Sequence, residues 1–304
     1  MILLVFEAIE PDLLQGFPEG VEVAFLPREA PLSERALRAE FAVAPYGSGS
    51  RRFFAELPNL RDLKVVQTLT AGVDWILPHL PTGMVLCDAA GIHDIPVSEW
   101  IVAAVLGAIK RFPEFRDAQR EQRWAYRWVD DLEGSTVLFL GYGSIARATE
   151  KRLTPFEVKF IRVARTAREG VYGFAALSEL LPKADVVINL LPYTPQTHKL
   201  IGAEHFAQMK PGALFVNAGR GKTVDQEALV EAIRARLVRL VSDVSDPEPL
   251  PEGHPLWSLP EVFLTPHIAG STPRLFERGF KLVHQQVARY VRGEPLHNVV
   301  TDGY

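Results

Sequence analysis

Three side chains suited to acid–base chemistry and anion binding each follow a predicted apolar strand in the second half of the chain. Arg220 lies in N-A-G-R-G-K-T-V-D, Glu248 in D-V-S-D-P-E-P-L-P and His267 in T-P-H-I-A-G-S. The carboxyl ends of parallel strands share one edge of a sheet, and ligands of open α/β sheets bind there. We therefore expect the three side chains to converge.

These residue types suit the reduction of a small 2-keto acid. The planar guanidinium of Arg220 can hold a carboxylate and polarise a keto oxygen, because its donors have a fixed geometry. His267 titrates near neutral pH and can donate a proton to the developing alkoxide. Glu248 would favour the imidazolium, raise the pKa of His267 and orient its ring. Taken singly, the three read equally well as a surface ion pair, a turn cap and a loop histidine.

A dinucleotide-binding fingerprint precedes them in T-V-L-F-L-G-Y-G-S-I-A, residues 136–146. An apolar run leads into a glycine turn, and a helix-compatible segment follows at once. Gly141 would make the turn, and Gly143 would let the backbone approach a pyrophosphate at the helix N-terminus. Ala146 replaces the third glycine, at the position where the helix packs on the strand.

The end of the next predicted strand indicates which dinucleotide is bound. NAD-binding domains place an acidic residue about 20 residues beyond the glycines, where it binds the ribose 2′-hydroxyl. Here K-F-I-R-V runs into Ala164, Arg165 and Thr166, with Arg168 close behind. Because arginine attracts a dianionic 2′-phosphate, we expect NADP(H) to be preferred, with NAD(H) possible. The alternative is an exposed loop arginine without a cofactor role.

Two series of short apolar strands, separated by helical segments, must position these residues. The first series is 2–6, 21–26, 41–44, 63–68 and 84–87; the second is 136–140, 159–163, 185–191, 214–217, 237–243 and 262–265. Such a pattern is typical of α/β proteins whose parallel sheets are covered on both faces. We predict two doubly wound parallel-sheet domains. A flavodoxin-like substrate-binding domain, residues 1–97 and 273–304, is discontinuous because the last helix returns to it, and residues 98–272 form a Rossmann NAD(P)-binding domain.

A predicted helix start lies between the two series, at Pro96-Val97-Ser98-Glu99, with Ser98 as N-cap. The helix that follows, residues 100–109, is apolar on nearly every side and should be buried where the chain crosses between domains. Residues 110–130 then interleave arginines with Trp124 and Trp128. Acidic neighbours offset these arginines, so a solvated arm or subunit contact is favoured over nucleic-acid binding.

Composition narrows the class of protein. The chain of 304 residues has a formal net charge of −4, which gives no reason to expect nucleic acid. Its single cysteine, Cys87, excludes an internal disulfide, and no apolar run approaches the roughly 20 residues that span a bilayer. The N-terminus lacks the basic start of a signal peptide. We expect a cytoplasmic protein without a membrane contact, and no spacing of His, Cys, Asp and Glu suggests a metal site.

The chain resembles the D-isomer-specific 2-hydroxyacid dehydrogenase family, most of all its glyoxylate/hydroxypyruvate reductase branch. G-Y-G-S-I-A, L-P-Y-T-P-Q-T, the 217–225 stretch, D-V-S-D-P-E-P-L-P and P-H-I-A-G occur in that family's order and near its spacing. The resemblance implies NAD(P)H-dependent reduction of a glyoxylate- or hydroxypyruvate-like 2-keto acid to the D-2-hydroxy acid. It also implies a homodimer formed through the dinucleotide domain.

The resemblance implies roles for individual residues. Arg220 would anchor the substrate, His267 would donate the proton to it, and Glu248 would partner His267. Backbone groups of Ala71 and Gly72 would hold the substrate carboxylate. Asp243 would meet the nicotinamide carboxamide, and Pro192 would border the cofactor. The implied cofactor-binding set is Gly141, Gly143, Ser144, Ile145, Arg165, Thr166, Pro192, Ala218, Asp243, His267, Ala269 and Gly270.

Two alternatives stay open at this point. Proteins of the same fold serve as dinucleotide-sensing corepressors, although the joint presence of Arg220, Glu248 and His267 speaks against a purely non-catalytic role. The segment P-Y-G-S-G-S, residues 45–50, reads equally well as a substrate loop and as a glycine-rich connection.

Overall fold

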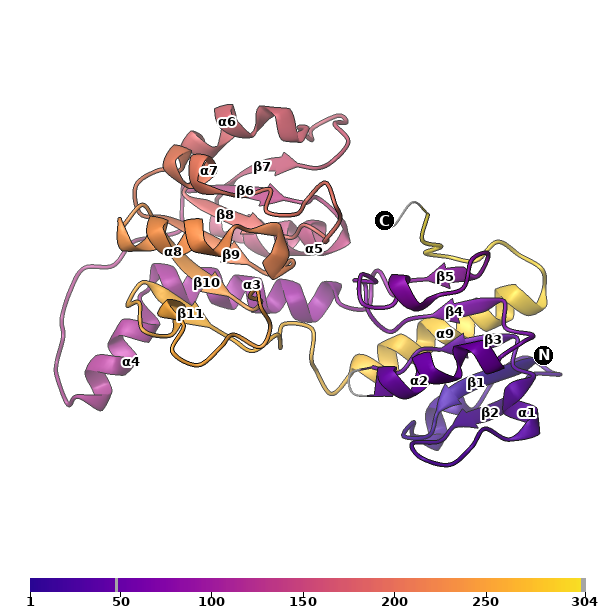
Figure 1. The fold of residues 1–304 in the computed structure, drawn as a ribbon. Coiled ribbons are helices and arrows are strands. Elements are labelled where there is room, and N and C mark those ends of the chain that lie inside the picture. Colours follow the sequence, from indigo (N-terminus) through magenta and orange to yellow (C-terminus); the bar gives the residue numbers. More distant parts are fainter. Residues whose placement is uncertain (47–48, 302–304) are drawn as a thin grey trace. The chain divides into compact units, whose positions relative to one another are not determined.

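The computed structural model describes residues 1–46 and 49–301, and the chain divides into two compact units (Figure 1). One unit joins Met1–His93 to Thr272–Tyr304, and the other is Asp94–Ser271. Each is built on one parallel sheet, which confirms the predicted α/β class. The domain limits at 97/98 and 272/273, and the assignment of substrate and cofactor to the two units, stay predictions. Gly47 and Ser48 of the 45–50 segment lie outside the described residues.

The discontinuous unit has the strand order β2-β1-β3-β4-β5, with every neighbouring pair parallel. The strands are β1 Ile2–Phe6, β2 Glu22–Leu26, β3 Phe41–Val43, β4 Val65–Gln67 and β5 Val85–Cys87. Successive β1 side chains face opposite sides of the sheet. Leu3 packs with Phe280 of α9 (Leu275–Val291), and Leu4 packs with Ala36 of α1 (Glu34–Leu37) and Phe53 of α2 (Ser50–Glu56).

The second unit has the strand order β11-β10-β9-β8-β6-β7, again entirely parallel. The strands are β6 Thr136–Leu140, β7 Lys159–Val163, β8 Val186–Asn189, β9 Ala213–Asn217, β10 Val238–Ser242 and β11 Val262–Leu264. In this order β7 lies on one side of β6, and β8, β9, β10 and β11 follow one another on the other side. This reversal of strand order creates a switch point at the carboxyl ends of β6 and β8, where doubly wound sheets bind ligands.

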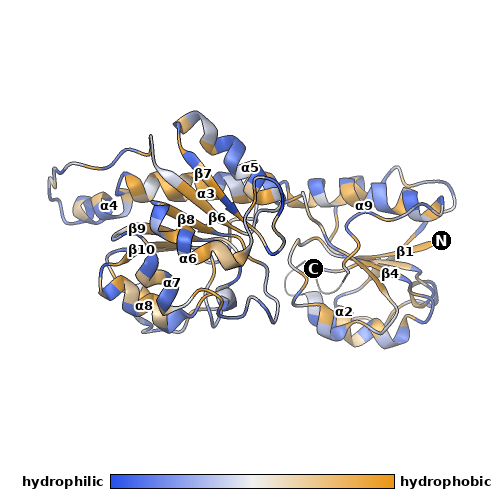
Figure 2. Ribbon diagram, turned by 90° about the horizontal axis from the view of Figure 1, so that it is seen from above, coloured by the Kyte–Doolittle hydropathy of each residue, from blue (hydrophilic) through white to orange (hydrophobic). Residues whose placement is uncertain are grey.

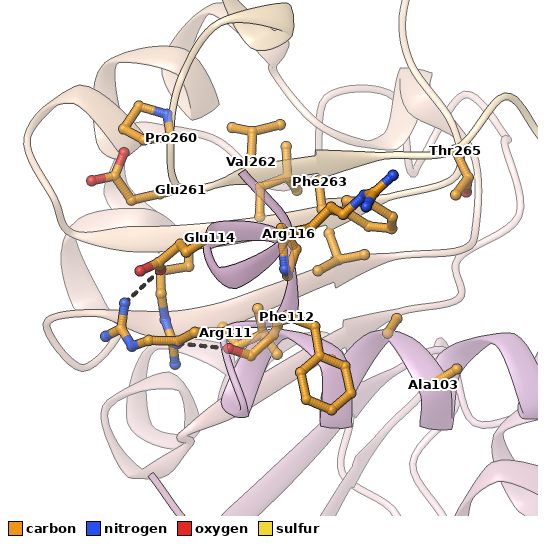
Figure 3. Close-up of a pocket in the computed structure, with 18 of the residues that line it drawn as sticks. Ala103, Arg111, Phe112, Glu114, Arg116, Pro260, Glu261, Val262, Phe263 and Thr265 are labelled. Atoms are coloured by element: carbon orange, nitrogen blue, oxygen red, sulfur yellow. Dashed lines mark hydrogen bonds and ion pairs between the residues drawn. The ribbon is translucent and has the colours of Figure 1, made fainter. Parts of the chain in front are cut away.

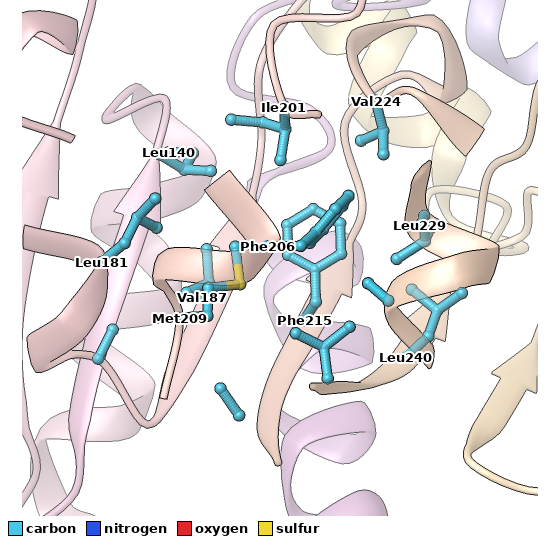
Figure 4. Close-up of a cluster of buried hydrophobic side chains, with 14 of the residues drawn as sticks. Leu140, Leu181, Val187, Ile201, Phe206, Met209, Phe215, Val224, Leu229 and Leu240 are labelled. Atoms are coloured by element: carbon cyan, nitrogen blue, oxygen red, sulfur yellow. The ribbon is translucent and has the colours of Figure 1, made fainter. Parts of the chain in front are cut away.

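Helices cover both faces of this second sheet, whose strands are largely hydrophobic (Figure 2). On one face, Phe206 of α7 (Ala203–Gln208) packs edge-on against Phe215 of β9, among α6 (Leu177–Leu180) and α8 (Gln226–Arg234) (Figure 4). On the other face lie α3 (Asp94–Ile109) and α5 (Ser144–Leu153). The remaining helix, α4 (Phe112–Arg120), follows α3.

The predicted start of the long apolar helix at Ser98 is wrong, because α3 begins at Asp94. Pro96 falls in the first turn, where a missing backbone N–H costs no hydrogen bond. The Ser98 hydroxyl therefore caps nothing and instead donates back to the carbonyl of Ile95, at 2.9 Å. The burial expected of residues 100–109 is met in part in the single chain. Ile101 and Val105 are buried, whereas Ala103 is exposed.

Candidate active site

The glycine turn after β6 has the geometry that its sequence predicts. Gly141 adopts φ +92°, and a Cβ there would lie 2.9 Å from the backbone of Leu190, so only glycine fits. Ala146 is fully buried in the third position of the motif. A Cβ on Gly143 would meet nothing within 4 Å, which leaves the approach to the α5 N-terminus open on that side.

The first turn of α5 can accept an anion. Arg147 N is the first amide of the turn to find a helical acceptor, Gly143 O at 3.2 Å, so the N–H groups of Ser144 and Ile145 lack one. Among the described residues no side chain caps the helix, although the Ser144 hydroxyl donates to Asp94 Oδ1 at 2.7 Å. Free amides and the helix dipole together favour a phosphate group, so this turn fits the pyrophosphate of a dinucleotide.

Arginines gather at the end of β7. Arg165 and Thr166 are exposed in the loop that follows the strand. Arg168 returns to the glycine turn, where it donates to Tyr142 O at 2.8 Å and lies over the Tyr142 ring. Arg162 is instead paired with Glu150, at 2.7 and 2.5 Å. The sequence did not indicate the return of Arg168, which depends on a tight turn closed by hydrogen bonds between Arg168 and Val171.

The loop after β9 is fixed by close packing. A Cβ on Gly219 would lie 2.7 Å from Leu191 O, and one on Gly221 would lie 2.0 Å from Ser245 O. Both positions therefore require glycine, and Arg220 between them is half-buried with Nη1 donating to Gly219 O at 3.1 Å. The next turn, a 3-10 helix at Gly221–Thr223, keeps Arg220 at the carboxyl edge of the sheet.

A buried amide pair, which sequence reasoning missed, supports this loop. Asn189 Nδ2 at the end of β8 donates to Asn217 Oδ1 (3.0 Å) and to the Thr223 hydroxyl (2.8 Å). The Thr223 hydroxyl in turn donates to Arg220 O at 2.7 Å. Ala218 N donates to Asn189 O at 3.0 Å, and Pro192 follows on the same strand exit. Buried polar groups that satisfy one another in this way hold one loop conformation.

Asp243 organises the loop that carries His267. Its nearly buried carboxylate accepts from Ile268 N and Ala269 N, both at 2.8 Å, and from the Thr265 hydroxyl at 2.5 Å. His267 N also donates to Asp243 O at 2.8 Å. Ala269 is buried by this arrangement, and Gly270 follows it in the turn. These hydrogen bonds give Asp243 a structural role. The contact with the nicotinamide carboxamide, which the family resemblance predicts for Asp243, would be additional.

His267 and Glu248 form a pair at the same edge. His267 Nδ1 lies 2.5 Å from Glu248 Oε1, and since an ionised carboxylate only accepts, Nδ1 is the donor. Among the described residues no group bonds to His267 Nε2, so this atom can exchange a proton with a ligand. The side chains are 47% and 41% exposed, which leaves them open to solvent or substrate.

The pair shifts both pKa values. The hydrogen bond that His267 donates to Glu248 raises the pKa of His267, against opposing effects from burial and from the positive charge of Arg220. Burial pushes the pKa of Glu248 up, but the hydrogen bond and charge of His267, a backbone hydrogen bond from Ser245 and the charge of Arg220 together bring it below its ordinary value. The structure therefore brings His267 and Glu248 into contact, with the charge of Arg220 close enough to act on both.

Ala71 and Gly72, the other predicted substrate-binding residues, belong to the discontinuous unit. They lie in the loop after β4 and are half-buried. Neither backbone N–H donates a hydrogen bond to another of the described residues. Successive free N–H groups in a turn can bind an anion.

A separate hollow of about 460 Å³ lies beside α3, α4, β10 and β11 (Figure 3). Its lining is mostly apolar and includes Ala103, Phe112, Val262 and Phe263, with the Arg111–Glu114 ion pair at its border. None of Arg220, Glu248 and His267 lines it.

The described residues contain no cluster of three or more His, Cys, Asp or Glu side chains fit to hold a metal ion. In the same part of the chain, every helix is too short or too polar to cross a bilayer.

Comparison with known proteins gives the family. The model of the D-isomer specific 2-hydroxyacid dehydrogenase NAD-binding domain matches residues 102–269. A glyoxylate reductase of Thermofilum pendens is 33% identical over 248 residues, which cover 77% of this chain and 73% of that protein. The NADPH-dependent glyoxylate/hydroxypyruvate reductase of Sinorhizobium meliloti, solved with NADP and sulfate, has a TM-score of 0.83 at 29% identity, covering 100% of this chain and 99% of that one.

A second solved structure agrees. The D-isomer specific 2-hydroxyacid dehydrogenase of Xanthobacter autotrophicus Py2, in complex with NADPH and MES, has a TM-score of 0.85 at 28% identity. The similarity covers 99% of this chain and 100% of that one, and therefore both units. The chain thus belongs to the D-isomer specific 2-hydroxyacid dehydrogenase family, in its glyoxylate/hydroxypyruvate reductase branch, and is a nicotinamide-dinucleotide-dependent dehydrogenase of small 2-hydroxy acids.

Proposed function

We propose that this enzyme reduces a small 2-keto acid of the glyoxylate or hydroxypyruvate kind to the D-2-hydroxy acid. The observation that carries the proposal is the pairing of His267 with Glu248, within electrostatic reach of Arg220. A cation, a proton donor and a carboxylate partner at one sheet edge are what the reduction of a keto group next to a carboxylate requires.

His267 provides the proton. Its raised pKa keeps more of the ring protonated near neutral pH, which is the form that donates during reduction. Because Nδ1 is tied to Glu248, the proton leaves from Nε2 and reaches the keto oxygen. The bound nicotinamide supplies the hydride to the keto carbon. After donation the neutral ring keeps its Nδ1–H on Glu248, so its orientation is preserved for the reverse reaction.

Arg220 and the loop after β4 hold the substrate. The Arg220 guanidinium can bridge the substrate carboxylate and the keto oxygen, where it stabilises negative charge as the alkoxide develops. Backbone N–H groups of Ala71 and Gly72 take the rest of the carboxylate. In this assignment the discontinuous unit is the substrate-binding domain, and the unit with the glycine turn is the NAD(P)-binding domain.

The cofactor proposal is a preference for NADP(H). Arg165 and Thr166 stand where NAD-binding domains carry an acidic residue, and Arg168 adds a second positive charge beside the glycine turn. Gly141, Gly143, Ser144 and Ile145 would hold the pyrophosphate. The rest of the set, placed toward the nicotinamide, is Pro192, Ala218, Asp243, His267, Ala269 and Gly270. The solved relatives from Sinorhizobium meliloti and Xanthobacter autotrophicus Py2 bind NADP and NADPH, which supports this choice.

A homodimer completes the proposal. The hollow beside α3 and α4 is apolar, and the segment after α4 exposes Trp124 by 95% and Trp128 by 87%. Aromatic side chains so exposed in a single chain favour contact with a second one. We therefore propose that a second copy of this chain covers the hollow. The 110–130 segment of that copy would pack across it.

The test is the loss of reduced-nicotinamide absorbance with glyoxylate, hydroxypyruvate, pyruvate or phenylpyruvate, measured with NADPH and with NADH. Rapid oxidation of NADPH by the two smallest acids supports the proposal. Faster oxidation of NADH would keep the chemistry and overturn the cofactor preference. Tight cofactor binding without turnover of any of the acids would favour the dinucleotide-sensing alternative, which the intact His267–Glu248 pair argues against.

A further inference from the structure

Several backbone carbonyl groups of the loop after β4 accept hydrogen bonds from side chains. Gln67, fully buried, donates to Thr68 O at 2.9 Å, and its own oxygen accepts from Gln286 of α9 at 2.9 Å. His93 Nε2 lies 3.1 Å from Leu69 O. The Thr68 hydroxyl donates to Thr70 O at 2.7 Å. The path of the backbone is therefore set by side chains before any ligand arrives.

The orientation of one amide follows directly. In a trans peptide the C=O and the N–H point in opposite directions. Thr70 O is held by the Thr68 hydroxyl and also by Ala89 N, at 3.0 Å. The N–H of Ala71, in the same peptide unit, must then point away from both of these donors.

The second half of the loop is held by one indole and one hydroxyl. Trp75 Nε1 lies 3.0 Å from Thr70 Oγ1 and 3.0 Å from Gly72 O. The Thr70 hydroxyl donates to Gly72 O at 2.7 Å. Gly72 O thus receives both donors, and the Trp75 ring is placed by Phe54 of α2, with ring centres 5.8 Å apart. These hydrogen bonds among Trp75 Nε1, the Thr70 hydroxyl and Gly72 O close the turn around Ala71 and Gly72, and we call them the Trp75–Thr70 latch.

We infer that Thr70 and Trp75 are positioning residues that preset the turn at Ala71 and Gly72 for the carboxylate of the substrate. The inference rests on the proposed function, since it gives these two side chains a part in binding the 2-keto acid. Without the latch, the turn would have to be ordered at the moment of binding, and part of the binding free energy would be lost. The carboxylate contacts exist in the ground state and the transition state alike, so their loss affects KM more than kcat.

Four variants test the latch. Trp75→Phe keeps an aromatic ring beside Phe54 and deletes the indole N–H. Thr70→Val deletes the hydroxyl group, whereas Thr70→Ser keeps a hydroxyl group at this position. The control is Thr154→Val, which removes a hydroxyl bonded to a backbone carbonyl at 2.8 Å in the other unit. We expect Trp75→Phe and Thr70→Val to raise KM for the keto acid about tenfold, as the loss of one or two hydrogen bonds would. Changes in kcat should stay below about twofold, with unchanged NADPH affinity, and Thr70→Ser should behave as wild type.

Binding of oxalate, followed by isothermal titration calorimetry, separates this inference from the proposed function. If the wild type reduces no 2-keto acid, the proposed function is wrong. Even then, oxalate binding that is weaker in Trp75→Phe and Thr70→Val, and unchanged in Thr70→Ser and Thr154→Val, would support the latch. An unchanged KM and unchanged oxalate affinity in both variants would overturn the inference. Equal losses in kcat, NADPH affinity and melting temperature would also overturn it, because they indicate a general structural defect.

Discussion

His267 Nδ1 lies 2.5 Å from Glu248 Oε1, while the His267 backbone adopts φ +53°. A non-glycine residue adopts this left-handed region only where its surroundings hold it there. Here the neighbouring amides of Ile268 and Ala269 bond to the Asp243 carboxylate, and His267 N bonds to Asp243 O. The strand end at β10 therefore sets the backbone, and Glu248 sets the ring, before substrate binds.

The first prediction concerns pH. Glu248→Gln weakens the hydrogen bond and removes the negative charge with which Glu248 raises the pKa of His267. Burial and the charge of Arg220, which lower that pKa, then meet only the smaller raising effect of Asp243. Reduction needs the protonated ring, so activity is present below the pKa of His267 and is lost as pH rises through it. In Glu248→Gln the loss of reductase activity with rising pH should therefore begin at a lower pH than in the wild type. We expect kcat/KM for reduction at pH 8 to fall about ten- to a hundredfold, with a smaller deficit at pH 6.

The control for this profile is Glu252→Gln, an exposed carboxylate on the same connection between β10 and β11. Its profile should match that of the wild type. If the midpoint for Glu248→Gln stays where the wild type has it, Glu248 does not set the protonation of His267.

The strands were predictable because each is a short apolar run in a sheet covered on both sides. Ile2–Phe6, Thr136–Leu140 and Lys159–Val163 have the predicted ends, and the other strands differ at their ends by only a few residues. The start of α3 was not predictable in the same way. P-V-S-E reads as an N-cap signal, and only the packed structure shows that Pro96 fits the first turn of a helix that begins at Asp94.

The sequence predicted the convergence of Arg220, Glu248 and His267 from their common position after strands of one sheet, and the structure brings His267 and Glu248 into contact there. What the sequence did not indicate are contacts between distant segments. The approach of Arg168 to Tyr142 O joins residues 26 apart, and the Asn189–Asn217 bond joins residues 28 apart. Such bonds depend on which strands become neighbours, and local patterns carry no information about side chains across that distance.

The second prediction separates the two glycines of the turn. In Gly143→Ala the new methyl group meets no protein atom within 4 Å, so the free energy of unfolding should change by less than about 1 kcal/mol. The same methyl group would stand where a pyrophosphate approaches, and we expect NADPH affinity, measured by fluorescence titration, to fall at least about tenfold.

Gly141→Ala should show the opposite pattern in stability. Its φ of +92° and the 2.9 Å approach to Leu190 should cost about 1–3 kcal/mol of unfolding free energy in urea. Unchanged NADPH affinity in a stably folded Gly143→Ala enzyme would contradict the pyrophosphate site.

The third prediction concerns cofactor choice. Arg165→Ala removes an exposed guanidinium beside the expected 2′-phosphate, and a hydrogen bond to a charged group contributes about 1.5–3 kcal/mol. The ratio of kcat/KM with NADPH to that with NADH should therefore fall about ten- to a hundredfold, chiefly through a higher KM for NADPH. Arg234→Ala, at the end of α8, is the control for removal of a positive charge and should leave the ratio unchanged. An unchanged ratio in Arg165→Ala would mean that Arg165 is an ordinary loop residue.

The fourth prediction concerns the dimer. Light scattering after size-exclusion chromatography should give the wild type twice the 33.8 kDa of a single chain. Ala103 is exposed on α3 and lines the apolar hollow, so Ala103→Arg would place a charge inside the proposed contact, where it would lose hydration without gaining a partner. We expect the variant to elute with the mass of one chain at micromolar concentration.

The control for the dimer is Ala55→Arg, which adds the same side chain at an exposed position of α2, in the other unit. It should remain dimeric, because α2 takes no part in the proposed contact. A wild type with the mass of one chain would contradict the homodimer altogether. A dimeric Ala103→Arg protein would instead keep the dimer and exclude the face of α3 from its interface, since a buried unpaired guanidinium is not tolerated at the centre of an apolar contact.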